Sequence, residues 1–149
     1  MNYFPTGQPH TKTEGVVYIQ LGEVNSEAND EMYVELNNGS GSVQRIGIYV
    51  DGSNYVRNLI VGNGDSSNIQ TNYEPQSNDK IAISYKTNEA KIFVNGIKRG
   101  VTDTTVGVPA TSIFSLQANT GNRVQSHSFR DVKLYNTALT DQELIALTS

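Results

Sequence analysis

The sequence contains no cysteine and no tryptophan, and only two histidines. The absence of cysteine excludes disulfide bonds, thiolate zinc ligands and cysteine nucleophiles. His10 and His127 are too few for a zinc site without cysteine ligands, and neither accompanies a G-x-S-x-G serine motif. The composition therefore indicates neither a zinc site nor a serine or cysteine hydrolase.

Charge and long apolar runs are also scarce. The 149 residues include 15 Asp and Glu against 11 Lys and Arg, for a net charge of −4, and no run of basic residues. This balance argues against nucleic-acid binding. No apolar run approaches the ~20 residues of a membrane-spanning helix, so we expect no membrane insertion. Residues 1–14 lack the pattern of a secretory signal and are interpreted as a lead-in or linker, followed by one domain over residues 15–149.

Short segments of alternating apolar and polar residues dominate the rest of the chain, separated by turns rich in Gly, Asn and Ser. Asn95-Gly96 is the strongest hairpin signal. The pattern predicts an all-β, two-sheet antiparallel β-sandwich. A flexible connection is expected over residues 62–78. The expected strands are 16–21, 32–37, 43–50, 55–61, 80–85, 91–94, 97–98, 112–118 and 126–135.

The phase of the alternation predicts which side chains face the core. In the segment 32–37, Met32 and Val34 are expected to point inward and Tyr33 outward. Phe129 and Val132 are three residues apart, which breaks strict alternation and indicates a β-bulge. Asp131, between them, is expected to be a buried charge with a structural role.

One short helix is predicted at the C-terminus. Thr140 can cap it, and Glu143 can reach back to complete a capping box. Leu139 and Leu144 have the spacing of a hydrophobic staple. A helix ending at Leu147 has about two turns and is too short to be stable alone. It must therefore pack on the sandwich, most simply on the strand before it.

Three sequence motifs resemble a known family. Asp131–Tyr135 reads D-V-x-L-Y, and residues 136–144 read N-x-A-L-T-D-x-E-L. Val94–Gly96 reads V-N-G, and Arg45–Ile48 reads R-I-G-I. Together they are similar to laminin G-like, concanavalin A-like jelly-roll domains, and the C-terminal motif is most similar to those of bacteriophage tail and fibre proteins. The resemblance implies a jelly roll with the helix at its edge.

The resemblance also implies a function. We expect a non-enzymatic carbohydrate- or host-receptor-binding module of a phage tail or fibre, located on a virion or outside the cell. Its partner would be a glycan or a host surface polysaccharide, and it would form a homo-oligomer, a trimer if it is a fibre domain. The alternative is a structural virion decoration or oligomerisation domain without a small ligand. A glycoside hydrolase or polysaccharide lyase is disfavoured, because the E-x-D-x-x-E and E-x-D-x-E motifs of related glucanases are absent.

Candidate ligand-binding residues follow from the need for aromatic faces and hydrogen-bonding groups in sugar binding. Tyr49 is out of phase with the core residues of its strand and lies beside Arg45, while Tyr73, Asn119 and Arg123 fall in expected loops. Outward tyrosines can equally be cross-strand packing partners, so that alternative stays open.

No cofactor and no metal ligand are predicted. Some relatives in the resembled family bind one Ca²⁺ through Asp, Asn and carbonyl oxygens, so a calcium site is the alternative. Two oxygen-rich loops are the places for it, although neither has EF-hand spacing. These loops contain Asn25, Asn29 and Asp30, and Asn63, Asp65 and Asn68.

Overall fold

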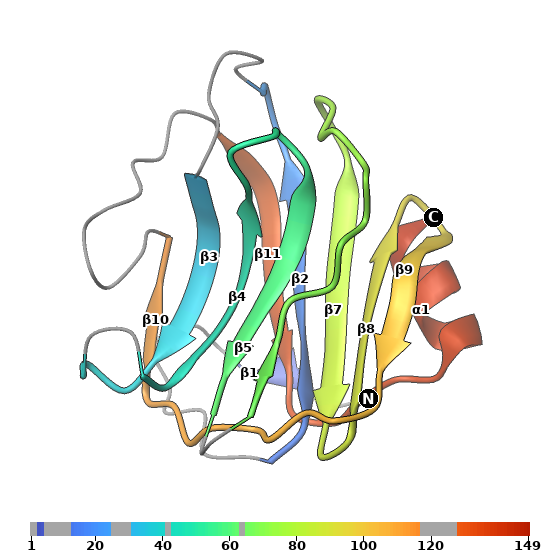
Figure 1. The fold of residues 1–149 in the computed structure, drawn as a ribbon. Coiled ribbons are helices and arrows are strands. Elements are labelled where there is room, and N and C mark those ends of the chain that lie inside the picture. The colour runs from blue at the N-terminus through green and yellow to red at the C-terminus, as the bar shows by residue number, and fades with distance from the viewer. Residues whose placement is uncertain (1–2, 5–12, 25–30, 41–42, 63–64, 117–127) are drawn as a thin grey trace.

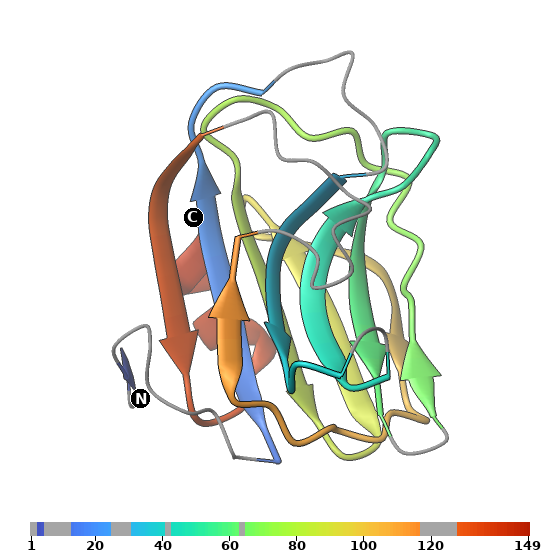
Figure 2. The ribbon, with the colours of Figure 1, turned by 90° about the vertical axis from the view of Figure 1, so that its left-hand side faces the viewer.

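The computed structural model describes residues 3–4, 13–24, 31–40, 43–62, 65–116 and 128–149. Within them, two antiparallel sheets pack face to face, which confirms the predicted sandwich (Figures 1 and 2). One sheet has the order β1-β11-β2-β7-β8-β9. Its strands are β1 (Tyr3–Phe4), β2 (Gly15–Leu21), β7 (Lys80–Lys86), β8 (Glu89–Val94), β9 (Ile97–Asp103) and β11 (Phe129–Tyr135).

The other sheet has the order β10-β3-β4-β5-β6. Figure 2 looks onto its outer face, where β10, β3, β4 and β5 follow one another from left to right. The single described helix, α1 (Asp141–Thr148), follows β11 at the C-terminus. The strands of this second sheet are β3 (Glu31–Asn37), β4 (Arg45–Val50), β5 (Val56–Val61), β6 (Ser66–Ser67) and β10 (Ile113–Ser115).

The hydrophobic core lies between the two sheets. In the central strands, alternation brings one apolar face inward, as predicted for β2 and β4. Each fully buried aliphatic side chain contributes about 1.5–3 kcal/mol relative to exposure to water. The inward residues of these two strands are Val17, Ile19 and Leu21, and Ile46, Ile48 and Val50.

A β-bulge changes the facing of residues at the start of β3. The register with β4 shifts between Met32 and Val34, so Tyr33 and Val34 both enter the core. There, the Tyr33 ring meets Phe129 edge-on, with centroids 6.5 Å apart. Met32 instead lies on the outer face against Tyr49. The predicted phase is therefore wrong for Met32 and Tyr33, because an extra residue in a strand inverts the alternation before it.

The predicted bulge in the last strand is confirmed by a register shift between Phe129 and Asp131. The prediction that Asp131 is a buried charge is wrong. Its side chain is 41% exposed and forms an ion pair with Lys133 at 3.3 Å. Arg130, next to it, donates to Oδ1 of Asn78 at 2.7 Å.

Helix α1 has the predicted capping box. The backbone N–H of Glu143 donates to the Thr140 hydroxyl at 3.2 Å, and the backbone N–H of Thr140 donates to the Glu143 carboxylate at 3.2 Å. Leu139 and Leu144 are both buried, but the helix is not held on the preceding strand alone. It lies on the outer face of the six-stranded sheet (Figure 1). The apolar residues beneath it are Val16, Tyr18, Ala82, Phe93 and Tyr135.

The segment after β5 is more firmly held than its composition indicates. Oδ1 of the buried Asn58 accepts from the backbone N–H of Ile69 at 2.5 Å, and its Nδ2 donates to the Ser67 hydroxyl at 3.0 Å. The Thr71 hydroxyl donates to the Val56 carbonyl at 2.5 Å. The expected flexible connection is therefore wrong for residues 66–73, which are anchored to β5. No helix in the described part of the chain is long and apolar enough to cross a membrane.

Candidate functional site

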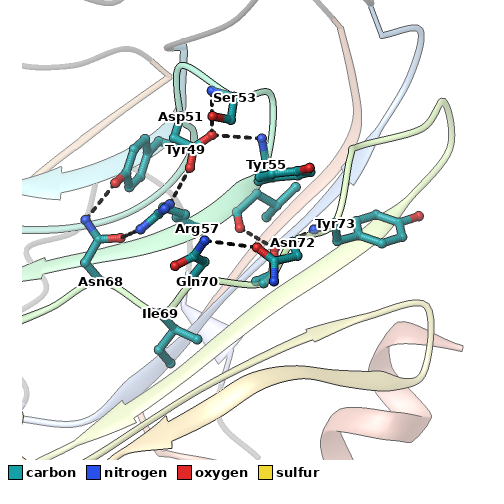
Figure 3. Close-up of polar contacts among 12 residues, drawn as sticks. Tyr49, Asp51, Ser53, Tyr55, Arg57, Asn68, Ile69, Gln70, Asn72 and Tyr73 are labelled. Carbon is teal, nitrogen blue, oxygen red and sulfur yellow. Dashed lines mark hydrogen bonds and ion pairs between the residues drawn. The ribbon is translucent and has the colours of Figure 1, made fainter.

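A polar cluster lies on the outer face of the five-stranded sheet (Figure 3). Tyr49 of β4 and Arg57 of β5 are partners in register. Nδ2 of Asn68 donates to the Tyr49 hydroxyl at 2.7 Å, and Oδ1 of Asn68 accepts from Arg57 at 3.2 Å. One amide therefore connects the tyrosine to the arginine.

Asp51 holds Arg57 in this position. Its Oδ2 accepts from Nε of Arg57 at 2.5 Å. Its Oδ1 accepts from the backbone N–H groups of Ser53 and Tyr55 at 2.9 and 3.0 Å. Partial burial acts to raise the pKa of Asp51, but these hydrogen bonds and the guanidinium outweigh it and lower that pKa. The ion pair is therefore maintained at neutral pH, and the arginine charge is neutralised.

Arg45 lies on the same face of β4 as Tyr49 but contacts different residues. It faces the carboxylate of Glu35 at 3.5 Å, and the Glu35 side chain is completely buried. The same carboxylate accepts from the side-chain amide of Asn37 at 3.0 Å. The Arg45 side chain is 14% exposed. The Arg45 side chain is thus turned largely into the sheet surface.

Tyr73 lies in a separate network, and its ring points away from the Tyr49 cluster (Figure 3). Its hydroxyl donates to Oδ2 of the buried Asp79 at 2.9 Å, and the Arg99 guanidinium lies 4.5 Å from its ring centroid. Burial and the hydrogen bond to Asp79 raise the pKa of Tyr73 to about 12. Asp79 also accepts from Asn95 at 2.7 Å. The structure therefore holds Tyr73 as an anchor between the 71–79 segment and the six-stranded sheet.

The five predicted ligand-binding residues are only partly brought together. Arg45 and Tyr49 share one sheet face, Tyr73 is on another network, and Asn119 and Arg123 lie outside the described residues. Tyr49 is buried, with 6% of the residue exposed, so it supports Asn68 through its hydroxyl and offers little ring surface for stacking. Ligand contact by any of the five stays a prediction.

A bulge in β9 creates a hollow beside the polar cluster. Ala90 of β8 pairs with Asp103 of β9, and Ile92, two residues further along β8, pairs with Arg99, four residues away from Asp103. Two additional residues are therefore accommodated on β9, where Gly100 has a positive φ of 71°. The bulge pushes Val101 out of the sheet surface, and its side chain is 84% exposed.

The hollow lies between this bulge and the segment after β6, and has a volume of about 350 Å³. We call it the amide groove, because two of its lining side chains are exposed carboxamides. The close approach of the two segments requires Gly100, since a Cβ there would come 2.4 Å from Ile69 and 2.8 Å from the Gln70 carbonyl oxygen. The lining residues are Asn68, Ile69, Gln70, Val101, Thr102 and Asp103.

The groove retains hydrogen-bonding capacity on its exposed side. Gln70 donates one N–H to Oδ1 of Asn72 at 3.0 Å, which leaves a second N–H and its carbonyl oxygen. Asn68 uses one N–H and one lone pair in the Tyr49–Arg57 cluster and keeps one of each. Donors and acceptors are thus presented side by side next to the apolar Val101, a combination suited to a sugar ring with hydroxyls and C–H faces.

Beneath the groove, a buried chain of hydrogen bonds connects the two sheets. Asn58 donates to Ser67, and Ser67 hydrogen-bonds to Asp103. Oδ1 of Asp103 also accepts from the backbone N–H and the hydroxyl of Thr105, both at 2.9 Å. Partial burial acts to raise the pKa of Asp103, but these hydrogen bonds outweigh it and lower that pKa. Asp103 is therefore a fixed carboxylate at neutral pH.

A second hollow, of about 380 Å³, lies beside the start of α1. Several of its charged side chains pair with one another, since Lys91 pairs with Asp141 at 2.7 Å and with Glu89 at 3.4 Å. Exposed side chains with unused donors and acceptors favour the amide groove as the candidate site.

Sequence reasoning did not find this groove. The sequence pattern indicates Asn68 only for the calcium alternative, and it gives no binding prediction for Gln70, Val101, Thr102 or Asp103. One signal was available: Gly100 inside an otherwise strand-like stretch marks a bulge.

The calcium alternative stays a prediction. Among the described residues, no group of three or more His, Asp or Glu side chains is placed to hold a metal ion. Oδ1 of Asn68 accepts from Arg57 and Nδ2 donates to Tyr49, which leaves one oxygen lone pair. Of the other residues named for it, only Asp65 is described, and the rest lie outside the described residues.

The sandwich, its edge helix and its polar outer face define a lectin-like β-sandwich domain. A family model described as the concanavalin A-like lectin/glucanases superfamily matches residues 17–145. The chain belongs to this superfamily. No curated protein sequence matches it significantly.

Solved structures with the same fold cover nearly the whole chain. The CBM40 domain of the Ruminococcus gnavus IT-sialidase, bound to α2,3-sialyllactose, has a TM-score of 0.70 at 12% identity, covering 100% of this chain and 97% of that one. Domain 4 of the Geobacillus stearothermophilus arabinanase AbnA, in complex with arabinotriose, has a TM-score of 0.67 at 15% identity, covering 99% and 71%. A heptameric SAP-like pentraxin from Limulus polyphemus has a TM-score of 0.70 at 13% identity, covering 99% and 74%. At these identities the likeness concerns the fold.

Proposed function

We propose that the protein is a non-enzymatic carbohydrate-binding module and that its ligand lies in the amide groove. The observation that carries the proposal is the pair of exposed carboxamides Asn68 and Gln70, with the half-buried Thr102, beside the exposed Val101. Each sugar hydroxyl is both a donor and an acceptor, and carboxamides match it with both groups on one plane. Val101 supplies an aliphatic contact for the C–H face of the ring.

The groove is preorganised, which favours binding of a flexible, well-hydrated ligand. Asn68 is oriented by Tyr49 and Arg57, and the backbone beneath it by Asn58. Side chains already fixed in the free protein lose less entropy when the ligand binds. The proposal assigns Tyr49 and Arg57 to positioning Asn68 rather than to direct contact.

The absence of catalysis is part of the proposal. Glycoside hydrolysis requires two carboxyl groups about 5–9.5 Å apart that face the bond to be cleaved. The carboxylates described on the outer face of the five-stranded sheet, Glu35 and Asp51, are each paired with an arginine. Asp103 is the single carboxylate among the described residues of the groove.

The biological setting is proposed from the C-terminal motif. Residues 136–144 resemble those of phage tail and fibre domains. We therefore place the module on a virion or outside the cell, with a host surface polysaccharide as its partner. Binding of the protein to the surface of a bacterial host, and its loss after enzymatic removal of the capsule, would support this setting.

Glycan arrays followed by isothermal titration calorimetry test the function. The double variant Gln70→Ala/Thr102→Ala removes two groove groups without touching the buried Asn58 chain, and we expect it to bind at least about tenfold more weakly. Gln142→Ala is the matched control, because it removes an exposed carboxamide on α1, and its affinity should be unchanged. Folded wild-type protein that binds no glycan would refute the proposal.

A structural role is the second candidate. β10 is the outermost described strand on its side of the five-stranded sheet, and it exposes Ile113, with Leu116 exposed just beyond it. An edge strand with exposed apolar side chains is a template for pairing with another chain. This reading predicts a homo-oligomer, a trimer in a fibre, which Ile113→Lys would dissociate in light scattering coupled to size exclusion. A wild-type monomer would exclude it.

A further inference from the structure

On the basis of the proposed glycan binding, we infer that the amide groove accepts neutral, hydroxyl-rich sugar units and rejects sugars that carry a carboxylate. The charges around the groove support this choice. Asp103 is the single charged residue among the six described residues that line it. An acidic sugar would therefore bring a second negative charge next to a carboxylate without a lining lysine or arginine to offset either one.

Arg57, the arginine of the polar cluster beside the groove, is not available to compensate. Arg57 donates to Asp51 at 2.5 Å and to Asn68 at 3.2 Å. The contact with Asp51 balances the charge of Arg57. The contact with Asn68 places the Asn68 side chain between Arg57 and the groove. An acidic ligand would have to displace Asp51, whose Oδ1 is also fixed by two backbone N–H groups.

Asp103 cannot readily turn away or lose its charge. Three donors hold it: the Ser67 hydroxyl, and the backbone N–H and hydroxyl of Thr105. Ser67 is itself held by the buried amide of Asn58. A carboxylate fixed in this way is a good acceptor for neutral hydroxyl groups, and it repels anions.

The polar and apolar groups of the groove fit the same ligand. Gln70 retains one N–H and a carbonyl oxygen, and Thr102 adds a hydroxyl. These groups pair with hydroxyls, and none carries the positive charge that usually binds a carboxylate. Val101 offers an aliphatic surface beside them. A neutral pyranose satisfies both kinds of group.

The test compares matched neutral and acidic ligands by calorimetry at low salt. Suitable pairs are lactose with its α2,3-sialylated form, and galactose oligomers with galacturonic acid oligomers. We expect the neutral member of a pair to bind at least about tenfold more tightly. Asp103→Asn keeps the side-chain size and removes the charge, so this preference should shrink at least about threefold. Asp65→Asn changes the net charge equally from outside the groove lining and should leave the preference unchanged.

Each outcome separates the two proposals. Tighter binding of acidic members would overturn the inference while glycan binding stands. The inference also fails if neutral glycans bind but neither Asp103→Asn nor Gln70→Ala/Thr102→Ala has an effect, since the ligand then lies elsewhere. No binding to either member by protein with wild-type circular dichroism would remove the proposed function and the inference with it.

Discussion

Replacing Tyr73 with phenylalanine removes one hydrogen bond and leaves the ring in place. The lost bond runs from the hydroxyl to Oδ2 of Asp79 at 2.9 Å, while Arg99 remains 4.5 Å from the ring centroid. Because the acceptor is a buried carboxylate, the bond is stronger than an average one. We expect Tyr73→Phe to lower the free energy of unfolding by about 1.5 kcal/mol. Affinity for a groove ligand should change by less than about twofold.

Asp79→Ala is the second arm of a double-mutant cycle. It removes the acceptor for Tyr73, for the Gln76 backbone N–H at 2.7 Å and for the Asn95 amide at 2.7 Å. Because three donors then lose their acceptor, we expect the free energy of unfolding to fall by about 3–4 kcal/mol. In the double variant the shared bond is lost only once, so its effect should fall short of the sum by about 1–1.5 kcal/mol.

Urea unfolding followed by far-ultraviolet circular dichroism measures all four proteins. Tyr55→Phe is the matched control, because no hydrogen bond of its hydroxyl occurs within the described structure, and it should change stability by less than about 0.5 kcal/mol. Additive effects of Tyr73→Phe and Asp79→Ala would refute the anchoring role. A loss of ligand affinity above about tenfold in Tyr73→Phe would instead return Tyr73 to the binding site.

Three further predictions concern the edge helix, the groove and alkaline pH. Leu144 is a fully buried residue of α1, and Leu144→Ala should cost about 3 kcal/mol in urea unfolding, whereas Ile145→Ala, at a 43% exposed position of the same helix, should cost less than about 1 kcal/mol. Equal effects would contradict the docking of α1. Gly100→Ala places a Cβ 2.4 Å from Ile69 at a residue with positive φ, so it should lower the free energy of unfolding by about 2 kcal/mol or more and weaken glycan binding. A neutral effect in both assays would exclude the close approach of Gly100 to Ile69. Folding favours the protonated form of Tyr73, because its pKa is raised to about 12 in the folded protein. The stability that this group contributes should be fully present below pH ~10 and should fall as pH rises towards 12. Tyr73→Phe should flatten part of that decline in urea titrations at pH 9 to 11.

Much of the fold was predictable because its signals are local. The alternation in β2 and β4, the Asn95-Gly96 turn and the Thr140–Glu143 capping box each depend on a few neighbouring residues, and the structure contains all of them. The bulge near Asp131 was visible as a break in spacing. Its exposure was not, because burial depends on which strands lie alongside.

The errors came from non-local effects. The bulge in β3 placed Tyr33 in the core and Met32 outside it, although strict alternation assigned them the opposite way. The segment after β5 has few apolar residues, yet the buried side chain of Asn58 fixes it through Ser67 and Ile69. A polar residue inside a strand gives no indication of which distant backbone it will hold.

The candidate site depends on these same irregularities. A regular β9 would have kept Val101 and Thr102 within the sheet surface, and a loosely held connection would not have oriented Asn68 and Gln70. The bulge at Gly100 and the Asn58 chain bring the two segments together and open the groove between them. Under the proposed function, changing only the lining side chains should alter which sugar binds without altering the fold, because the sandwich holds the backbone of the groove. Specificity in this domain should therefore follow residues 68–70 and 101–103, while stability follows the core and α1.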